Sequence, residues 1–231
     1  MDKPDTALIV SIASIPQRIH LVDKTVKSFV RQTLPPARIL VVVPLSFRRW
    51  PGLTANITRI QHHALLEVHT CDQDDGPGTK LLCALPRAAE LWRGELAAKG
   101  TLAALVLADD DREYKPTALS LMAAAFRDSA GSERAFTFLR YELPGSGGLQ
   151  IGQGADLFAV PLAPLLRLDV KLFFEVACSV DERFRYHDDV WISALLQDVA
   201  GVRVCPVTLV DKDHALAPPQ FLGAVHGAKE T

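Results

Sequence analysis

The sequence lacks any concentration of positive charge. Its 25 Lys and Arg residues are matched by 27 Asp and Glu, so the formal net charge is −2 and the isoelectric point lies near 6.4. The adjacent arginines Arg48 and Arg49 form an isolated pair. Because proteins that bind nucleic acid carry clustered Lys and Arg, this composition argues against a nucleic-acid partner.

Cysteine is scarce as well, and none of it is closely spaced. The chain has four cysteines, with no Cys-x-x-Cys pair among them: Cys71, Cys83, Cys178 and Cys205. The paired spacing of zinc sites is therefore missing, and the scatter predicts no disulfide framework. We expect these side chains to be small buried apolar groups.

Long apolar runs are also missing. The first run, Ala7 to Ala13, is far shorter than the roughly 20 residues that a membrane-spanning helix needs. The residues before it, Met1 to Thr6, are polar and do not have the layout of a signal peptide. The simplest prediction is a cytoplasmic protein without a transmembrane segment, and peripheral membrane association stays open.

The sequence does contain alternating strand and helix patterns. Ala7–Ala13 and Arg38–Val43 read as buried strands, and apolar residues between them, over Leu21–Gln32, recur at helical spacing. This order predicts a parallel βαβ unit. Later segments continue the alternation around a central strand, Leu102–Ala108, and no repeat or low-complexity linker divides the chain. We therefore predict one α/β domain over residues 1–231, with a mostly parallel central sheet flanked by helices.

Three consecutive carboxylates follow the central strand: Asp109, Asp110 and Asp111. Adjacent carboxylates repel one another, and Mg²⁺ or Mn²⁺ would hold them together because these ions prefer oxygen ligands. The two-residue period of a strand places Asp109 and Asp111 on one side and Asp110 on the other. The alternative is an acidic turn before a helix, since acids favour helix N-termini.

Other polar residues follow the remaining predicted strands. Ser11 and Arg18 come at the end of the first strand, and the acidic loop that begins at Asp72 leads to Lys80. In open α/β sheets, ligands bind outside the carboxyl ends of the strands. Arg18 and Lys80 would supply positive charge for phosphate groups. Their alternatives are a surface ion pair for Arg18 and a solvated lysine for Lys80.

A second acidic pair, Asp188 and Asp189, opens a predicted helix. One of these carboxylates is a candidate general base, and the alternative is a simple helix cap. Trp191 on the same helix fits a core position better than a sugar-stacking surface. His214, after the last predicted strand, is either a metal ligand or an exposed side chain.

Three motifs occur in a fixed order. The stretch Ser11–Arg18 opens the chain, Leu107–Asp111 resembles a DXD motif, and Asp188–Ser193 resembles the acidic motif at the start of an acceptor-side helix. Together they resemble the GT-A (Rossmann-like) fold of nucleotide-sugar glycosyltransferases, in family-2-like or exostosin-like members.

The resemblance implies a division of the chain and an activity. Residues 7–111 would form the nucleotide-sugar-binding half, residues 112–214 the acceptor-binding half, and residues 215–231 a mobile tail. The implied reaction is metal-dependent transfer of a sugar from a nucleotide-diphosphate sugar, with a UDP-sugar favoured, to a glycan, lipid-linked or other hydroxyl acceptor. The implied sites are Asp111 and His214 for Mn²⁺ or Mg²⁺; Ser11, Arg18, Asp72, Lys80, Asp109 and Asp110 for the donor; and Asp189 with Asp188 for catalysis.

One departure from the family pattern and two other protein classes leave alternatives open. Common inverting members have Glu-Asp where this chain has Asp188-Asp189, whereas exostosin-like retaining members have Asp-Asp, so the stereochemical outcome is undecided. A sugar-phosphate nucleotidyltransferase would carry a Gly-rich loop after the first strand, and Ala13 to His20 contains no glycine. A non-catalytic nucleotide-sugar-binding protein also fits these motifs.

Overall fold

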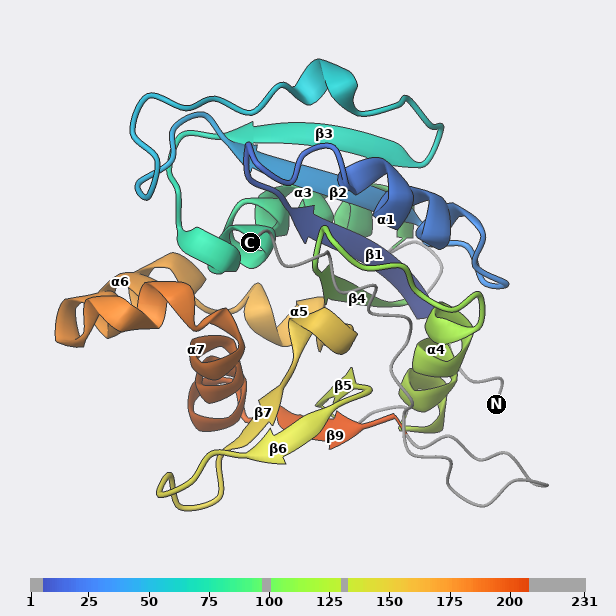
Figure 1. Ribbon diagram of the computed structural model, residues 1–231. Coiled ribbons are helices and arrows are strands. Elements are labelled where there is room, and N and C mark those ends of the chain that lie inside the picture. The colour runs from blue at the N-terminus through green and yellow to red at the C-terminus, as the bar shows by residue number, and fades with distance from the viewer. Residues whose placement is uncertain (1–5, 97–100, 130–132, 208–231) are drawn as a thin grey trace.

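The computed structural model describes residues 6–96, 101–129 and 133–207. Its main sheet has seven strands in the order β3-β2-β1-β4-β8-β5-β9 (Figure 1). Only β8 runs antiparallel to its neighbours β4 and β5, and the other pairs are parallel. The strands are β1 (Thr6–Ala13), β2 (Arg38–Pro44), β3 (Leu66–Cys71), β4 (Leu102–Ala108), β5 (Arg134–Thr137), β8 (Phe158–Pro161) and β9 (Arg203–Pro206). The predicted α/β class with a mostly parallel sheet is confirmed.

Helices cover both faces of this sheet, because successive residues of a buried strand face opposite sides. On β1, Val10 packs toward α1 (Val22–Val30) and α4 (Ala118–Asp128). Its neighbour Ile9 packs toward α3 (Ala84–Leu91) and the other helices of the opposite layer. The continuous apolar runs that predicted buried strands thus reflect two cores, one on each face.

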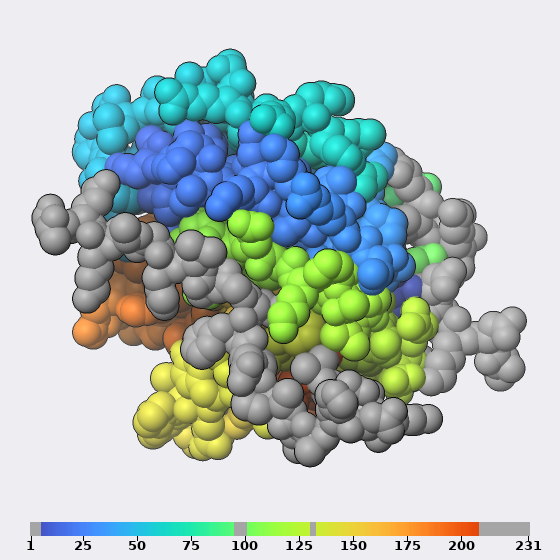
Figure 2. Space-filling view, turned by 45° about the vertical axis from the view of Figure 1, so that its right-hand side comes forward, coloured from blue at the N-terminus to red at the C-terminus, as the bar shows by residue number. Residues whose placement is uncertain are grey.

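The second half of the chain adds a small hairpin and three helices, and these helices share the core that α3 forms on one face of the main sheet. Strands β6 (Arg140–Glu142) and β7 (Gln150–Gly152) pair antiparallel in a sheet of their own. This hairpin projects from one edge of the molecule and is drawn in yellow in the space-filling view (Figure 2). The helices are α5 (Leu162–Leu165), α6 (Val170–Val180) and α7 (Asp188–Ala194).

Short helical turns complete the fold, and several of them border the polar edge of the sheet. The helical segment that begins at Thr79 is divided into α2 (Thr79–Leu82) and α3, and Pro86 lies in the first turn of α3, where its missing N–H is tolerated. The turns are η1 (Ile57–Arg59), η2 (Gly76–Gly78), η3 (Trp92–Leu96), η5 (Gly154–Asp156), η6 (Glu182–Tyr186) and η7 (Leu195–Val199). Among the helices in the described ranges, none has both the length and the apolar character that a membrane crossing requires.

The prediction that the cysteines form no disulfide was wrong. Cys71, at the end of β3, is bonded to Cys83, between α2 and α3, with their Cα atoms 6.1 Å apart. Spacing along the chain does not show that a helix returns to the end of the strand before it. Of the other two cysteines, Cys178 is buried and Cys205 is half-buried.

Candidate functional site

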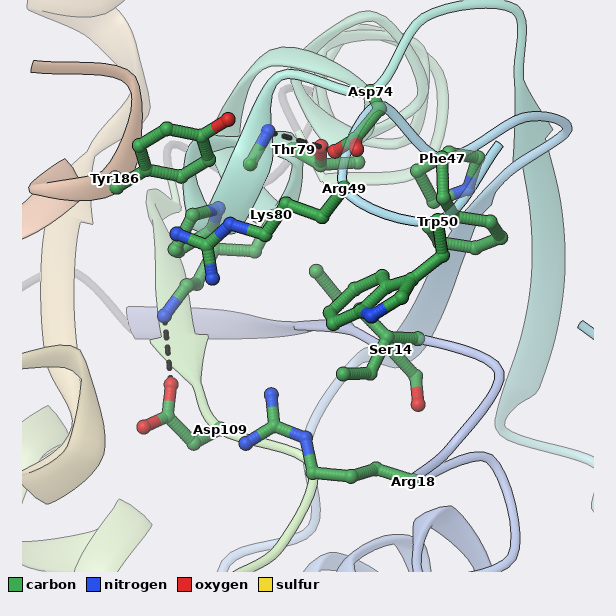
Figure 3. Close-up of a pocket in the computed structure, with 15 residues that line it drawn as sticks. Ser14, Arg18, Phe47, Arg49, Trp50, Asp74, Thr79, Lys80, Asp109 and Tyr186 are labelled. Atoms are coloured by element: carbon green, nitrogen blue, oxygen red, sulfur yellow. Dashed lines mark hydrogen bonds and ion pairs between the residues drawn. The ribbon is translucent and has the colours of Figure 1, made fainter. Parts of the chain in front are cut away.

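A pocket lies at the carboxyl ends of β1, β2 and β4, where the sequence predicted a ligand site (Figure 3). The cavity volume is about 100 Å³. Pockets for small organic ligands usually measure roughly 300–1,000 Å³, so this one encloses only part of such a ligand. The residues that line it are Ala13, Ser14, Ile15, Arg18, Pro44, Phe47, Arg49, Trp50, Asp74, Gly76, Pro77, Thr79, Lys80, Asp109 and Tyr186.

One end of the pocket is apolar. Ile15 follows β1, Pro44 ends β2, and Phe47 and Trp50 come from the loop after β2. Phe47 is buried and Trp50 packs against the same core, so that core fixes the two rings in place. Planar aromatic groups are good surfaces for stacking a flat ligand ring.

Arg18 carries positive charge to the other end and is held by the acidic triplet. Its Nε lies 3.1 Å from Oδ1 of Asp110, and its NH1 lies 3.1 Å from Oδ2 of Asp111. A guanidinium has five N–H donors, so two such contacts leave others for a ligand.

Asp110 is fully buried and supports the turn after β4. Ser14 Oγ donates a 2.6 Å hydrogen bond to its carboxylate, and Thr25 Oγ1 donates to its backbone carbonyl. Burial raises the pKa of Asp110 to about 6, although Arg18 opposes the shift. The carboxylate is enclosed by protein, so the expected contact of Asp110 with a donor does not fit its position.

Lys80 is the centre of the charged cluster. Its side chain is buried, and its Nζ lies 2.8 Å from Oδ1 of Asp109 and 3.1 Å from Oδ2 of Asp188. Burial lowers the pKa of Lys80, but the two carboxylates together raise it well above its usual value. Lys80 therefore joins the acid after β4 to the acid that begins α7, two residues far apart in sequence.

Tyr114 helps to hold Asp109 in place. Its backbone N–H donates to the Tyr114 hydroxyl at 3.1 Å, and the Tyr114 ring packs on Phe29 of α1 at 4.8 Å. Burial raises the pKa of Asp109, whereas the Lys80 charge and hydrogen bond lower it further than burial raises it. Tyr114 was not singled out from the sequence, where it reads as an ordinary aromatic residue after the acids.

Asp189 does not act as a cap of its own helix. The cap position of α7 is His187, which makes no side-chain capping bond. The Oδ1 atom of Asp189 instead accepts a 2.9 Å hydrogen bond from the backbone N–H of Gly154 in η5. Burial and the charge of Asp188 raise the pKa of Asp189 to about 7.

Gly154 permits this close approach. A Cβ atom on Gly154 would lie 3.0 Å from Lys80 Nζ and 3.4 Å from Asp189 Oδ1. The close packing of Lys80 and α7 against η5 explains why the chain has a glycine at position 154.

A second hollow of about 410 Å³ lies between the hairpin and the start of α7. Tyr141 on β6 contributes an aromatic ring to it, and His187 and Val190 flank the two acids of α7. Burial raises the pKa of Tyr141, and the Asp189 carboxylate adds to this rise. Asp189 thus acts electrostatically on the wall of this hollow. The remaining lining residues are Leu143, Asp181, Arg183 and Phe184.

Three of the residues expected to contact the donor do not line the first pocket, namely Ser11, Asp72 and the enclosed Asp110. Ser11 is fully buried and donates a hydrogen bond from Oγ to the Lys80 backbone carbonyl, so it helps to position the backbone of Lys80. Asp72 is exposed, and Asp74 from the same loop lines the pocket instead. Trp191 is buried in the core against Phe174, which agrees with its expected core position.

The three carboxylates after β4 are already paired with cations or enclosed by the protein. Asp109 is paired with Lys80 and Asp111 with Arg18, while Asp110 is enclosed. Within residues 6–96, 101–129 and 133–207, no group of three or more His, Cys, Asp or Glu side chains is arranged to hold a metal ion. The described residues therefore do not complete a metal site. His214, the other expected ligand, lies outside the described residues.

Comparison with known proteins gives a distant likeness. No protein-family model matches the chain, and no curated protein sequence matches it. Among solved structures, the chain is similar to the crystal structure of S. aureus TarS 1-349 in complex with UDP, at 17% sequence identity and a TM-score of 0.42. The alignment covers 71% of this chain and 49% of that chain, so the likeness spans about half of the TarS fragment.

Proposed function

We propose that this protein is a glycosyltransferase that moves a sugar from a nucleoside diphosphate sugar to a hydroxyl acceptor. One observation carries the proposal. The buried Lys80 ammonium binds both Asp109, which lines the first pocket, and Asp188, which begins the helix beside the second hollow. A transferase of this kind needs a donor site, an acceptor site and an acid–base group between them.

The first pocket suits a nucleotide. At its apolar end, the half-buried ring of Trp50 offers a surface for a base. Its other end presents Arg18, and guanidinium groups bind phosphate through paired N–H donors. Among nucleotide sugars, we favour a UDP-sugar as the donor.

Asp189 has the properties of a general base. Its pKa of about 7 leaves part of the population deprotonated at neutral pH, and that form accepts the proton of an acceptor hydroxyl. As the proton leaves, the acceptor oxygen forms a bond to the anomeric carbon, and the bond from that carbon to the diphosphate oxygen breaks. Arg18 neutralises negative charge on the leaving diphosphate.

The second hollow suits the acceptor. Tyr141 and Phe184 provide aromatic surface next to the polar groups of Arg183 and His187. A sugar ring has both apolar faces and hydroxyl groups, so a glycan acceptor matches this lining, and a lipid-linked glycan would present the same chemistry.

Metal dependence is a separate part of the proposal. Because the described residues do not complete a metal site, the proposed reaction steps use only protein side chains, namely Asp189 and Arg18. If Asp111 and His214 together bind Mn²⁺ or Mg²⁺, the ion would add positive charge beside the diphosphate. Nucleotide affinity would then increase when Mn²⁺ replaces EDTA in the buffer.

The proposal is tested by thermal shift and calorimetry with UDP, GDP and CMP, each with EDTA and with Mn²⁺. We expect UDP to raise the melting temperature, because a ligand that binds only the folded state stabilises it. Hydrolysis or transfer from the matching nucleotide sugar then separates an enzyme from a binding protein. Absence of any nucleotide-dependent stabilisation would contradict the proposed function.

A further inference from the structure

Arg49 occupies an unusual position in the first pocket. Its guanidinium lies over the ring of Tyr186, with Cζ 3.8 Å from the ring centroid (Figure 3). Arg49 belongs to the loop after β2, whereas Tyr186 ends η6, just before the acids of α7. The contact therefore joins the two halves of the chain beside the pocket that both residues line.

The charge of Arg49 has no carboxylate partner among the described residues. The other two pocket cations, Arg18 and Lys80, are each paired with two carboxylates. The neighbouring Arg48 is also engaged, since its Nε donates to the Asp74 carbonyl. Among the described residues, the charged group of Arg49 is placed against the face of the Tyr186 ring, which attracts a cation and leaves the N–H donors in the guanidinium plane available.

Both sides of this contact are fixed by the surrounding structure. On one side, the Asp74 carboxylate accepts hydrogen bonds from the backbone N–H groups of Arg48 and Gly76, which joins the loop carrying Arg49 to η2. On the other side, Asp75 pairs with Arg185, the residue before Tyr186, at 3.5 Å.

Gly76 allows η6 to lie close to η2. A Cβ atom there would lie only 2.5 Å from the Arg185 carbonyl oxygen, and the φ angle of +64° also favours glycine. The backbone that carries Tyr186 is therefore held against η2, and Arg49 reaches the Tyr186 ring from a loop that is itself bonded to Asp74. This geometry prepares a cation for a ligand and does not depend on the ligand to arrange it.

We infer that Arg49 is a phosphate-binding residue and that its contact with Tyr186 spans the pocket beside the bound nucleotide. The inference rests on the proposed function and adds a specific contact to it. The planar guanidinium binds two phosphate oxygens in its own plane while its face stays on the Tyr186 ring. Arg49 and Arg18 would then share the charge of the diphosphate.

The test compares UDP with uridine, which lacks the phosphates, by calorimetry for UDP and by NMR titration for the weaker nucleoside. We expect Arg49→Ala to weaken UDP binding about 10- to 100-fold, in line with a charged hydrogen-bonded contact, and to leave uridine binding unchanged. If GDP is the nucleotide that binds the wild-type protein, GDP and guanosine replace the pair.

Further variants separate the charge from the ring contact. Arg49→Lys should retain part of the affinity, because it keeps the charge but loses the paired donors. Tyr186→Phe should bind UDP like the wild type, whereas Tyr186→Leu should lose several-fold, since only the leucine removes the aromatic face. Arg59→Ala is the matched control, because Arg59 is an exposed arginine between β2 and β3 that does not line the pocket.

Two results would overturn the inference while leaving the proposed function intact. One is wild-type UDP affinity in Arg49→Ala. The other is an equal loss of UDP and uridine binding, which would indicate damage to the pocket and no phosphate contact. Failure of the wild-type protein to bind any of the nucleotides would instead remove the proposed function together with the inference.

Discussion

At the scale of single residues, Lys80 determines how the charged cluster is arranged. A buried ammonium is stable only with counter-charges around it, and two neighbouring carboxylates, one half-buried and one buried, are stabilised by a cation in the same way. Lys80 meets both needs by contacting Asp109 and Asp188. Sequence reading left open whether Lys80 was a solvated lysine, and burial excludes that alternative.

Replacement of Lys80 should therefore destabilise the protein. Lys80→Met leaves two carboxylates without their shared cation, and breaking a buried ion pair typically lowers the free energy of unfolding by about 3–5 kcal/mol. Urea denaturation measures the change. Lys27→Met on the exposed side of α1 is the control and should alter stability little. A Lys80→Met protein as stable as the wild type would show that the cluster does not depend on this cation.

Asp189 should control the pH dependence of catalysis. Its pKa is raised to about 7, so the basic form increases as the pH rises through that value. We expect turnover of the donor sugar to rise over the same range, and Asp189→Asn to lower kcat by roughly 10²–10⁴ with little effect on UDP affinity. The exposed Asp198→Asn, just beyond α7, serves as control. Equal losses of turnover and UDP binding in Asp189→Asn would indicate a structural role.

At the scale of elements, the segment between β3 and α3 carries much of the site. It includes Asp74, η2 and Lys80, and the Cys71–Cys83 disulfide closes it at both ends. The cross-link restricts the segment that forms one wall of the pocket. Disulfides persist mainly in oxidising compartments, so this bond does not favour the cytoplasmic location predicted from the sequence.

Removal of this disulfide should loosen the pocket wall. We expect reduction, or the double change Cys71→Ser with Cys83→Ser, to lower the free energy of unfolding by about 2–4 kcal/mol, since the cross-link limits the unfolded chain. Denaturation with and without dithiothreitol measures this, and the double variant should no longer respond to the reductant. Rapid alkylation of Cys71 and Cys83 in the unreduced protein would contradict the bond.

At the scale of the whole molecule, buried acids should shape stability against pH. Burial raises the pKa values of Asp110 to about 6 and of Asp189 to about 7, so the folded state binds more protons than the unfolded state above pH 4. The free energy of unfolding should therefore fall as the pH rises from about 4 to about 7. Glu67 acts oppositely below this range, because hydrogen bonding to Arg87 lowers its pKa to about 2.

Melting temperatures measured from pH 3 to pH 8 test this expectation. A maximum near pH 4 to 5 is expected, with a decline toward neutral pH. Asp189→Asn should flatten the upper part of that decline, since it removes the group with the higher pKa. A melting temperature that rises steadily to pH 7 would show that other groups dominate.

Much of the architecture followed from the sequence alone. Continuous apolar runs identified β1, β2 and β4, because a strand buried on both faces has no polar positions, and helical spacing identified α1. The acids after β4 and at the start of α7 were found for a similar reason, since charge directly beside an apolar run is conspicuous. The sequence thus determined the fold class and the edge of the sheet at which polar residues gather.

Tertiary structure decided what those residues do. Asp109, Asp110 and Asp111 are adjacent in sequence, yet one binds Lys80, one is enclosed with Ser14, and one meets Arg18 at the surface. Likewise, the Cys71–Cys83 bond, the bare Cα of Gly154 and the Arg49–Tyr186 contact join segments whose separation in the chain carries no information about distance. Local patterns record burial and periodicity, whereas partners and pKa values depend on which elements fold against one another.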